Sequence, residues 1–138
     1  MKVIVTSGYF DPLHVGHIEL FKLARQLGDK LIVIVNNDKQ AILKKGHFFM
    51  NENERMRIIY AIKYVDEVVL CIDEDASVCK TLEMIKPDIF AKGGDRYSYE
   101  IPEAKVCKEN NIKIVDGLGA KIQSSSELEK RSKLFNKS

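Results

Sequence analysis

Short apolar runs alternate with amphipathic segments along this chain. The runs are rich in Val and Ile and about five residues long, which is typical of strands that a sheet buries on both faces. Between them, apolar residues recur every three to four positions, which indicates helices with one buried side. We predict strands over residues 2–6, 31–35, 67–71, 89–91 and 112–115. We predict helices over residues 15–27, 51–63, 102–110 and 124–134, with another capped by Asp75 or Ser77 and ending before Pro87.

Polar and glycine residues mark the ends of several of these helices. Asn51 and Glu54 have the spacing of a capping box, as do Ser124 and Glu127. Gly28 is placed to end the first helix, and Pro102 suits a first helical position. Gly46 and the segment that follows it to Met50 suggest a flexible loop that closes over a ligand.

The alternation of strands and helices predicts one α/β domain over residues 1–138. Such a series forms a doubly wound, Rossmann-like parallel five-stranded sheet with helices on both faces. The last residues, 135–138, are expected to fray. Ligands of these folds bind beyond the carboxyl ends of the strands, so the loops after strands 2–6, 31–35 and 89–91 are the places to search for chemistry.

Composition narrows the class of protein further. The chain has 138 residues, of which 45% are hydrophobic and 30% charged, with a net charge of +2. No apolar run approaches the ~20 residues of a membrane span, and the first residues do not form a secretory signal. The weak charge gives no reason to expect a nucleic-acid partner. We therefore expect a protein that binds neither membranes nor nucleic acids.

The three cysteines, Cys71, Cys79 and Cys107, do not have C-x-x-C spacing. An odd number without that spacing argues against a disulfide framework and against a zinc ribbon. Free thiols are typical of a reducing compartment, and we expect a cytoplasmic protein.

Two common phosphate-binding motifs are missing from the sequence. It contains no G-x-x-x-x-G-K-[ST], which argues against a P-loop protein. It has no G-x-G-x-x-G after the first strand, which argues against a dinucleotide dehydrogenase.

The loop after the first strand instead reads G-Y-F-D-P-L-H-V-G-H over residues 8–17. His14 and His17 lie three positions apart, on one face of a first helical turn. That turn carries unpaired N–H groups and the positive end of the helix dipole, which both favour phosphate. Gly16 leaves room for a phosphate to approach the backbone. The two imidazoles could then stabilise charge in a transition state.

A zinc site is the alternative use of this histidine pair. Zinc needs a third protein ligand, and His47 is the other histidine of the chain. No H-E-x-x-H occurs, so we predict no metal ligands in the protein itself.

The pattern G-x-F-D-x-x-H-x-G-H resembles the signature of the cytidylyltransferase-like nucleotidyltransferase superfamily. This resemblance implies transfer of a nucleoside monophosphate from ATP or CTP to a phosphorylated small molecule, with release of pyrophosphate. The acceptor phosphate attacks the α-phosphorus in line, without a covalent enzyme intermediate. It also implies Mg²⁺ bound with the nucleotide, and a homodimer.

The resemblance assigns roles to individual positions. His14 and His17 would stabilise the α-phosphorus, and Lys44 and Lys45, on a mobile loop, would hold phosphates. The residues expected to bind the nucleotide are Gly8, Tyr9, Phe10, Gly16, Gly93, Gly94, Asp95, Ser124, Ser125 and Ser126. The residues expected to bind the acceptor are Asp11, Asp38 and Arg55. The plainer alternatives are a solvated lysine pair and an exposed Arg55 paired with a glutamate.

The acceptor is suggested by the later segments. The run from Lys92 to Asp95, the Tyr97 and Glu100 region and a Ser-rich helix start without a preceding Arg resemble the heptose-phosphate adenylyltransferases. Glycerol-phosphate cytidylyltransferases carry R-T-x-G-x there, and here only Lys121 could replace the Arg. ATP with a sugar phosphate such as heptose 1-phosphate is the leading prediction. CTP with glycerol 3-phosphate, FAD synthesis and a non-catalytic nucleotide sensor stay open.

Overall fold

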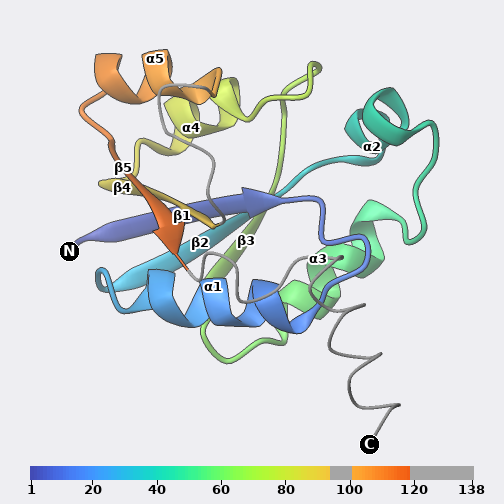
Figure 1. Cartoon of the computed structure of the whole chain (residues 1–138), viewed down its shortest axis with the longest axis horizontal. Coiled ribbons are helices and arrows are strands. Elements are labelled where there is room, and N and C mark those ends of the chain that lie inside the picture. Colours follow the sequence, from blue (N-terminus) through green and yellow to red (C-terminus); the bar gives the residue numbers. More distant parts are fainter. Residues whose placement is uncertain (94–100, 119–138) are drawn as a thin grey trace, which may run out of the picture.

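A parallel sheet forms the centre of the molecule (Figure 1). The computed structural model describes residues 1–93 and 101–118. The strands are β1 (Val3–Gly8), β2 (Lys30–Val35), β3 (Glu67–Leu70), β4 (Ile89–Gly93) and β5 (Lys113–Leu118), in the order β3-β2-β1-β4-β5. All pairings are parallel, and the winding reverses between β1 and β4. The predicted doubly wound, Rossmann-like fold is confirmed, with its switch point between those two strands.

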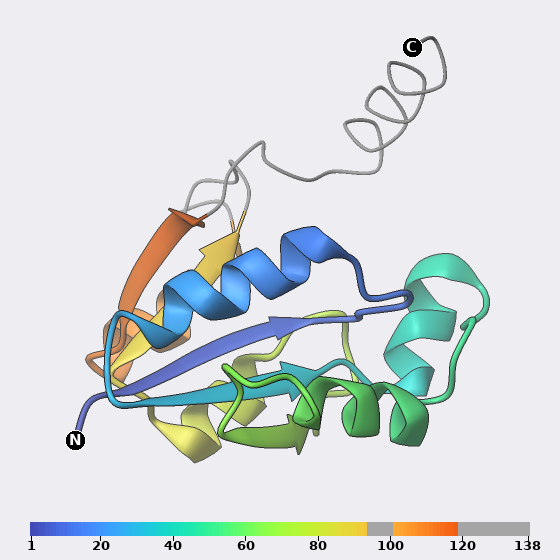
Figure 2. The same cartoon turned by 90° about the horizontal axis from the view of Figure 1, so that it is seen from below.

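Helices cover both faces of this sheet. They are α1 (Val15–Arg25), α2 (Asp38–Lys45), α3 (Glu52–Tyr60), α4 (Cys79–Ile85) and α5 (Glu103–Glu109). Helices α1 and α3 pack on one face, and α4 and α5 pack on the other. Helix α2 lies beyond the carboxyl ends of β1 and β2, as both Figure 1 and Figure 2 show. No helix among the described residues is long and apolar enough to span a bilayer.

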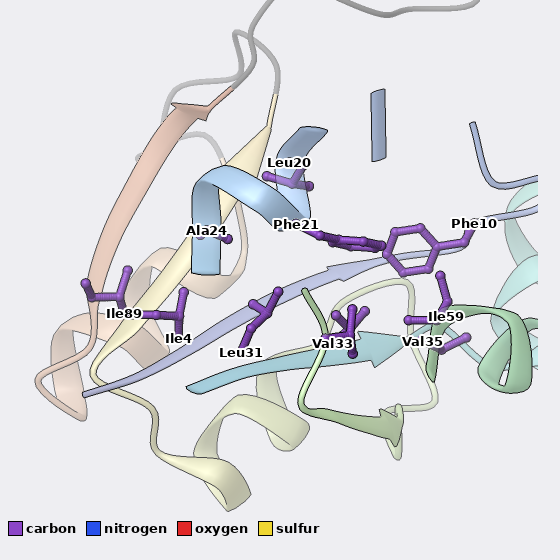
Figure 3. Packing of buried hydrophobic residues seen from close by; sticks show 12 residues of the cluster. Ile4, Phe10, Leu20, Phe21, Ala24, Leu31, Val33, Val35, Ile59 and Ile89 are labelled. Carbon is purple, nitrogen blue, oxygen red and sulfur yellow. The ribbon is translucent and has the colours of Figure 1, made fainter. Parts of the chain in front are cut away.

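The strand residues divide between two hydrophobic clusters because successive side chains point to opposite faces of a sheet. Ile4, Leu31 and Val33 pack toward α1 and α3, as Figure 3 shows. Val5 and Ile34 pack toward α4 and α5. Each of these side chains is fully buried, and burying one contributes about 1.5–3 kcal/mol.

The loop after β1 is anchored by Phe10. Its backbone adopts a left-handed conformation (φ 53°), which turns the ring back into the core, where it meets Phe21 edge to face at 5.4 Å (Figure 3). A Cβ atom at Gly8 would lie 2.8 Å from the Phe10 ring, so only glycine fits there. The Phe10 side chain is buried, and the contact with nucleotide that we predicted for it is not available to the ring.

Helix α2 is missing from the sequence-based prediction. Lys44 and Lys45 form its last turn, whereas we expected them on a mobile loop. The helix is opened by a capping box of Asn37 and Gln40 and closed by Gly46 at φ 83°. Both signals stand in the sequence, and they outweigh the weak apolar periodicity of this mostly exposed segment.

The N-terminus of α4 is also capped differently from the prediction. Val78 is the N-cap residue in place of Asp75 or Ser77, although Ser77 Oγ accepts the Cys79 N–H at 3.4 Å while Asp75 bonds to Ser77. The carboxylate of Asp73 accepts hydrogen bonds from the N–H groups of Lys80 and Thr81, at 2.7 and 3.0 Å. A buried aspartate from the preceding loop thus takes the capping role.

Asn51 opens α3 as predicted, and its side chain accepts the Glu54 N–H at 2.9 Å. The helix ends at Tyr60 rather than at Lys63. The helix predicted over 124–134 and the tail at 135–138 lie outside the described residues.

A buried guanidinium fastens the loops around the switch point together. The side chain of Arg55 is 0% exposed and donates four hydrogen bonds. Its acceptors are the carbonyls of Met50, Tyr9 and Asn36, at 2.9, 2.8 and 2.7 Å, and the carboxylate of Asp38 at 2.7 Å. Helix α3 therefore holds the loops that follow β1, β2 and α2.

The carboxylate of Asp11 also holds two of these loops together. It accepts the N–H groups of Phe49 and Met50 at 2.7 and 2.8 Å, which ties the segment after α2 to the loop after β1. Burial opposes ionisation of this group, but the two backbone hydrogen bonds together with the nearby charges of Arg55 and Lys45 outweigh it and lower the pKa of Asp11. The loop expected to be flexible is thus held at its end.

Replacing Arg55 by Ala tests this anchoring. The change leaves buried carbonyls and the Asp38 carboxylate without donors, and we expect the free energy of unfolding to fall by about 3–5 kcal/mol. Urea denaturation followed by circular dichroism measures it. Arg57→Ala, on the exposed part of the same helix, is the matched control and should shift stability by about 0.5 kcal/mol or less. Equal losses in the two variants would contradict the anchoring role.

Candidate functional site

The two histidines form a capping box built from imidazoles. His14 is the N-cap of α1, and its Nδ1 accepts the Gly16 N–H at 3.1 Å. His17 is the third helical residue, and its Nδ1 accepts the His14 N–H at 3.1 Å. The rings stack with centroids 3.8 Å apart. Capping and chemistry therefore use different nitrogens of the same two side chains.

These hydrogen bonds fix the tautomer of both rings. A nitrogen that accepts a backbone N–H carries no proton, so each neutral ring bears its proton on Nε2. Both imidazoles present an Nε2–H donor that the cap does not use. Helix α1 has no acidic residue in its first turn, so the positive end of its dipole is not offset there. The arrangement suits an anion such as a phosphate.

The histidines are neutral at pH 7 in the free protein. Burial, with the neighbouring His14 ring as a second cause, lowers the pKa of His17 to about 4. Burial also lowers the pKa of His14. The ring of His17 rests edge to face on Phe10 at 5.0 Å, which holds it against the core. The pair therefore acts on a bound phosphate first as hydrogen-bond donors.

Lys44 and Lys45 reach back from α2 to the loop after β1. Their ammonium nitrogens lie 4.7 and 5.6 Å from the centre of the Tyr9 ring, within the range of a cation–π interaction. Burial raises the pKa of the Tyr9 phenol, whose hydroxyl is buried and has no hydrogen-bond partner among the described residues. The two lysines are thus not a freely solvated pair, because an aromatic ring positions them.

A cavity of about 570 Å³ opens at the switch point of the sheet. It receives residues from the ends of β1 and β4 and from α2, the β3–α4 loop and the start of α5. Its lining includes Gly8, Tyr9, Asn36, Lys44, Val78 and Glu103. Of the predicted site residues, Gly8, Tyr9 and Lys44 line this cavity.

Several predicted residues have other positions. His14, His17 and Gly16 lie at the start of α1 and are not among the residues that line the cavity. Asp11 and Asp38 lie outside it too, and both hold loops. Arg55 is neither an exposed helical residue nor a lining residue, so we assign it a positioning role in place of the predicted contact with the acceptor.

The remaining predicted residues lie at the end of β4 or outside residues 1–93 and 101–118, which the structure describes. Gly93 is the last residue of β4. Gly94, Asp95, Ser124, Ser125 and Ser126 lie outside the described residues, so their contact with nucleotide stays a prediction. Residues 1–93 and 101–118 contain no group of three His, Cys, Asp or Glu side chains that could hold a metal ion.

Sequence reasoning missed Glu103 as a cavity residue. It is the first residue of α5, directly after Pro102, and only 7% of its surface is exposed. Its position in the sequence could have indicated this role, because the first turn of a helix that follows a central strand lies near the carboxyl ends of the strands.

Another cavity, of about 490 Å³, lies at the β3 edge of the sheet. Met56, Tyr60 and Val68 line it, and it contains none of the predicted site residues. This second cavity therefore gives no support to the predicted chemistry.

The neutral state of His17 predicts a dependence of stability on pH. An unfolded histidine has a pKa near 6.5, so between about pH 6.5 and pH 4 the unfolded chain binds a proton that the folded chain does not. The stabilising contribution is complete above pH 6.5 and is lost as the pH falls toward 4. His17→Gln keeps an acceptor at the third helical position and removes the titration. Urea denaturation at pH 7 and pH 5 should show a smaller loss in this variant than in the wild type. Equal losses, or an identical change in a His47→Gln control, would contradict this account.

Several known proteins are similar to this chain. The model of the family described as Cytidylyltransferase-like matches residues 5–126. The chain is 42% identical over 124 residues to the bifunctional protein HldE of Citrifermentans bemidjiense, which covers 84% of this chain and 25% of that protein. It is 37% identical over 139 residues to an FAD synthase of Thermococcus sibiricus, covering 97% and 90% of the two chains. The chain thus spans about a quarter of the length of the bifunctional relative.

A solved structure shows the same similarity. The lipopolysaccharide core biosynthesis protein of Thermoplasma volcanium GSS1 superposes with a TM-score of 0.71 at 34% identity, covering 84% of this chain and 95% of that one. The histidine capping box, the switch-point fold and these matches together show that the chain belongs to the Cytidylyltransferase-like family of nucleotidyltransferases.

Proposed function

We propose that this enzyme transfers the adenylyl group of ATP to a phosphorylated small molecule, and that a sugar phosphate such as heptose 1-phosphate is the acceptor. The observation that carries the proposal is the pair of Nε2–H donors at the N-terminus of α1, which follows the loop whose Tyr9 lines the switch-point cavity together with Lys44. The similarity to HldE and to FAD synthase supports adenylyl transfer over cytidylyl transfer.

The chemistry follows from where these groups lie. An oxygen of the acceptor phosphate forms a bond to the α-phosphorus of ATP, and the bond from that phosphorus to the bridging oxygen breaks. His14 and His17 donate Nε2–H groups to the oxygens on which charge grows. Lys44 lines the cavity and holds the acceptor phosphate, and Lys45 stands on the same helical turn.

Mg²⁺ is proposed to arrive bound to the triphosphate. Since the described residues form no metal site of their own, phosphate oxygens would supply most of its ligands. It would neutralise charge on the leaving pyrophosphate.

FAD synthesis is the second candidate. The FAD synthase relative matches nearly the whole length of both chains, and its product also carries an adenylyl group. The acceptor would then be FMN.

We also propose that the enzyme is a homodimer and that it works in the cytoplasm. Sedimentation of the purified protein tests whether it is a dimer.

A matrix of substrates separates these candidates. ATP, CTP, GTP and UTP are each combined with heptose 1-phosphate, α-D-mannose 1-phosphate, glycerol 3-phosphate and FMN, and pyrophosphate release is measured. We expect the highest rate with ATP and a sugar phosphate. A higher rate with FMN would favour FAD synthesis, and one with CTP and glycerol 3-phosphate would overturn the adenylyl proposal. Nucleotide binding without product in any combination would indicate a sensor.

Replacing His17 by Ala tests the role of the imidazoles. Loss of one transition-state donor lowers kcat about 10²–10³-fold. His17→Gln retains a capping acceptor, so its activity separates the loss of the donor from the loss of the cap. His47→Ala, outside the site, is the control and should retain wild-type turnover. Near-normal turnover of a folded His17→Ala enzyme would exclude the proposed role.

A further inference from the structure

The switch-point cavity is not uniformly basic. Lys44 enters it from α2, and Glu103 enters it from the first turn of α5. Figure 1 shows α2 beyond the carboxyl end of β1 and α5 on the face of the sheet opposite α1. A ligand in this cavity therefore meets a cation from α2 and a carboxylate from α5, and Lys92 and Asp75 also line it. A phosphate group is attracted to the first and repelled by the second.

The carboxylate of Glu103 is only half used by the protein. One oxygen accepts the Val78 N–H at 2.9 Å. Within residues 1–93 and 101–118, the other oxygen has no hydrogen-bond partner, and no cation lies within ion-pair distance of Glu103. That oxygen is also not among the buried polar atoms that lack a partner, so it faces open space. Glu103 is also one of the residues that line the cavity.

A carboxylate oxygen in such a position favours a hydrogen-bond donor from a ligand. The residue is 93% buried by the surrounding protein, which limits its access to bulk water. A buried charged acceptor without a donor is costly, so a ligand that supplies one gains affinity. Hydroxyl groups meet this need without adding a charge, and a carboxylate can accept from more than one of them.

We propose that Glu103 binds hydroxyl groups of the acceptor and so selects sugar or polyol phosphates. This inference rests on the proposed function, since it assigns the cavity to the acceptor. The phosphate of the acceptor lies toward Lys44 and Tyr9, and its hydroxyl-bearing carbons lie toward Glu103 and Val78. Glu103 is then a specificity-determining residue for the transfer reaction.

Glu103→Gln is the variant that tests this role. Glutamine keeps an oxygen for the Val78 N–H, but it replaces the charged free oxygen by a neutral group. Glu109→Gln is the matched control, because Glu109 lies on the same helix, is 59% exposed and pairs at 4.0 Å with Lys105 alone. Isothermal titration calorimetry, with a non-hydrolysable ATP analogue present, measures binding of two probes. One is α-D-mannose 1-phosphate, and the other is inorganic phosphate, which has the same anionic head and no sugar hydroxyls.

We expect Glu103→Gln to weaken α-D-mannose 1-phosphate about tenfold to a hundredfold and to change phosphate affinity by less than twofold. Glu109→Gln should change neither affinity by more than about twofold. Glu103→Asp keeps the charge on a shorter side chain and should also weaken the sugar phosphate selectively. It provides the same comparison if the glutamine variant does not fold.

Two results would overturn the inference. One is unchanged or absent binding of the sugar phosphate, and the other is an equal loss for both probes, which a purely structural role of Glu103 predicts. The pyrophosphate assay on the wild type reports separately on the proposed function. Selective binding through Glu103 without any transfer would refute the reaction and leave this binding role in place. Transfer whose rate does not change when Glu103 is replaced would refute this binding role and leave the proposed reaction in place.

Discussion

The buried guanidinium of Arg55 is the interaction on which the arrangement of the site depends. Three loop carbonyls around the switch point face the interior, where water cannot bond to them, and each needs a donor. A planar group with five N–H donors can satisfy all three and still pair with Asp38. A lysine in the same place has three donors on one nitrogen and cannot span these directions. A buried charged side chain therefore holds three loops in fixed positions relative to one another.

The loops and helices around the switch point each contribute a different kind of functional group. The loop after β1 delivers two imidazoles to the start of α1 and an aromatic ring to the cavity. Helix α2 delivers two ammonium groups to that ring. The start of α5 delivers a carboxylate to the same cavity. Donors, cations and an acceptor thus come from separate elements of the chain.

The sequence predicts the framework well, for reasons that are local. Val- and Ile-rich runs and amphipathic periods identify the strands and most helices, and the HxGH spacing places both histidines in one helical turn. Helix α2 was missed because its apolar face is small, although Asn37, Gln40 and Gly46 mark its ends. The roles of Arg55 and Glu103 depend on partners far along the chain, such as Tyr9 and Val78. No pattern of neighbours in the sequence shows whether such a side chain points inward.

The stacking of the two imidazoles has a consequence for how charge is delivered. With ring centroids 3.8 Å apart, a proton on one ring disfavours a proton on the other, so their titrations are coupled. Because each Nδ1 accepts a backbone N–H and each Nε2 already carries a proton, a further proton on either ring would have to displace a capping hydrogen bond. The pair therefore meets an anion as two neutral donors, and a positive charge on it would cost α1 part of its cap.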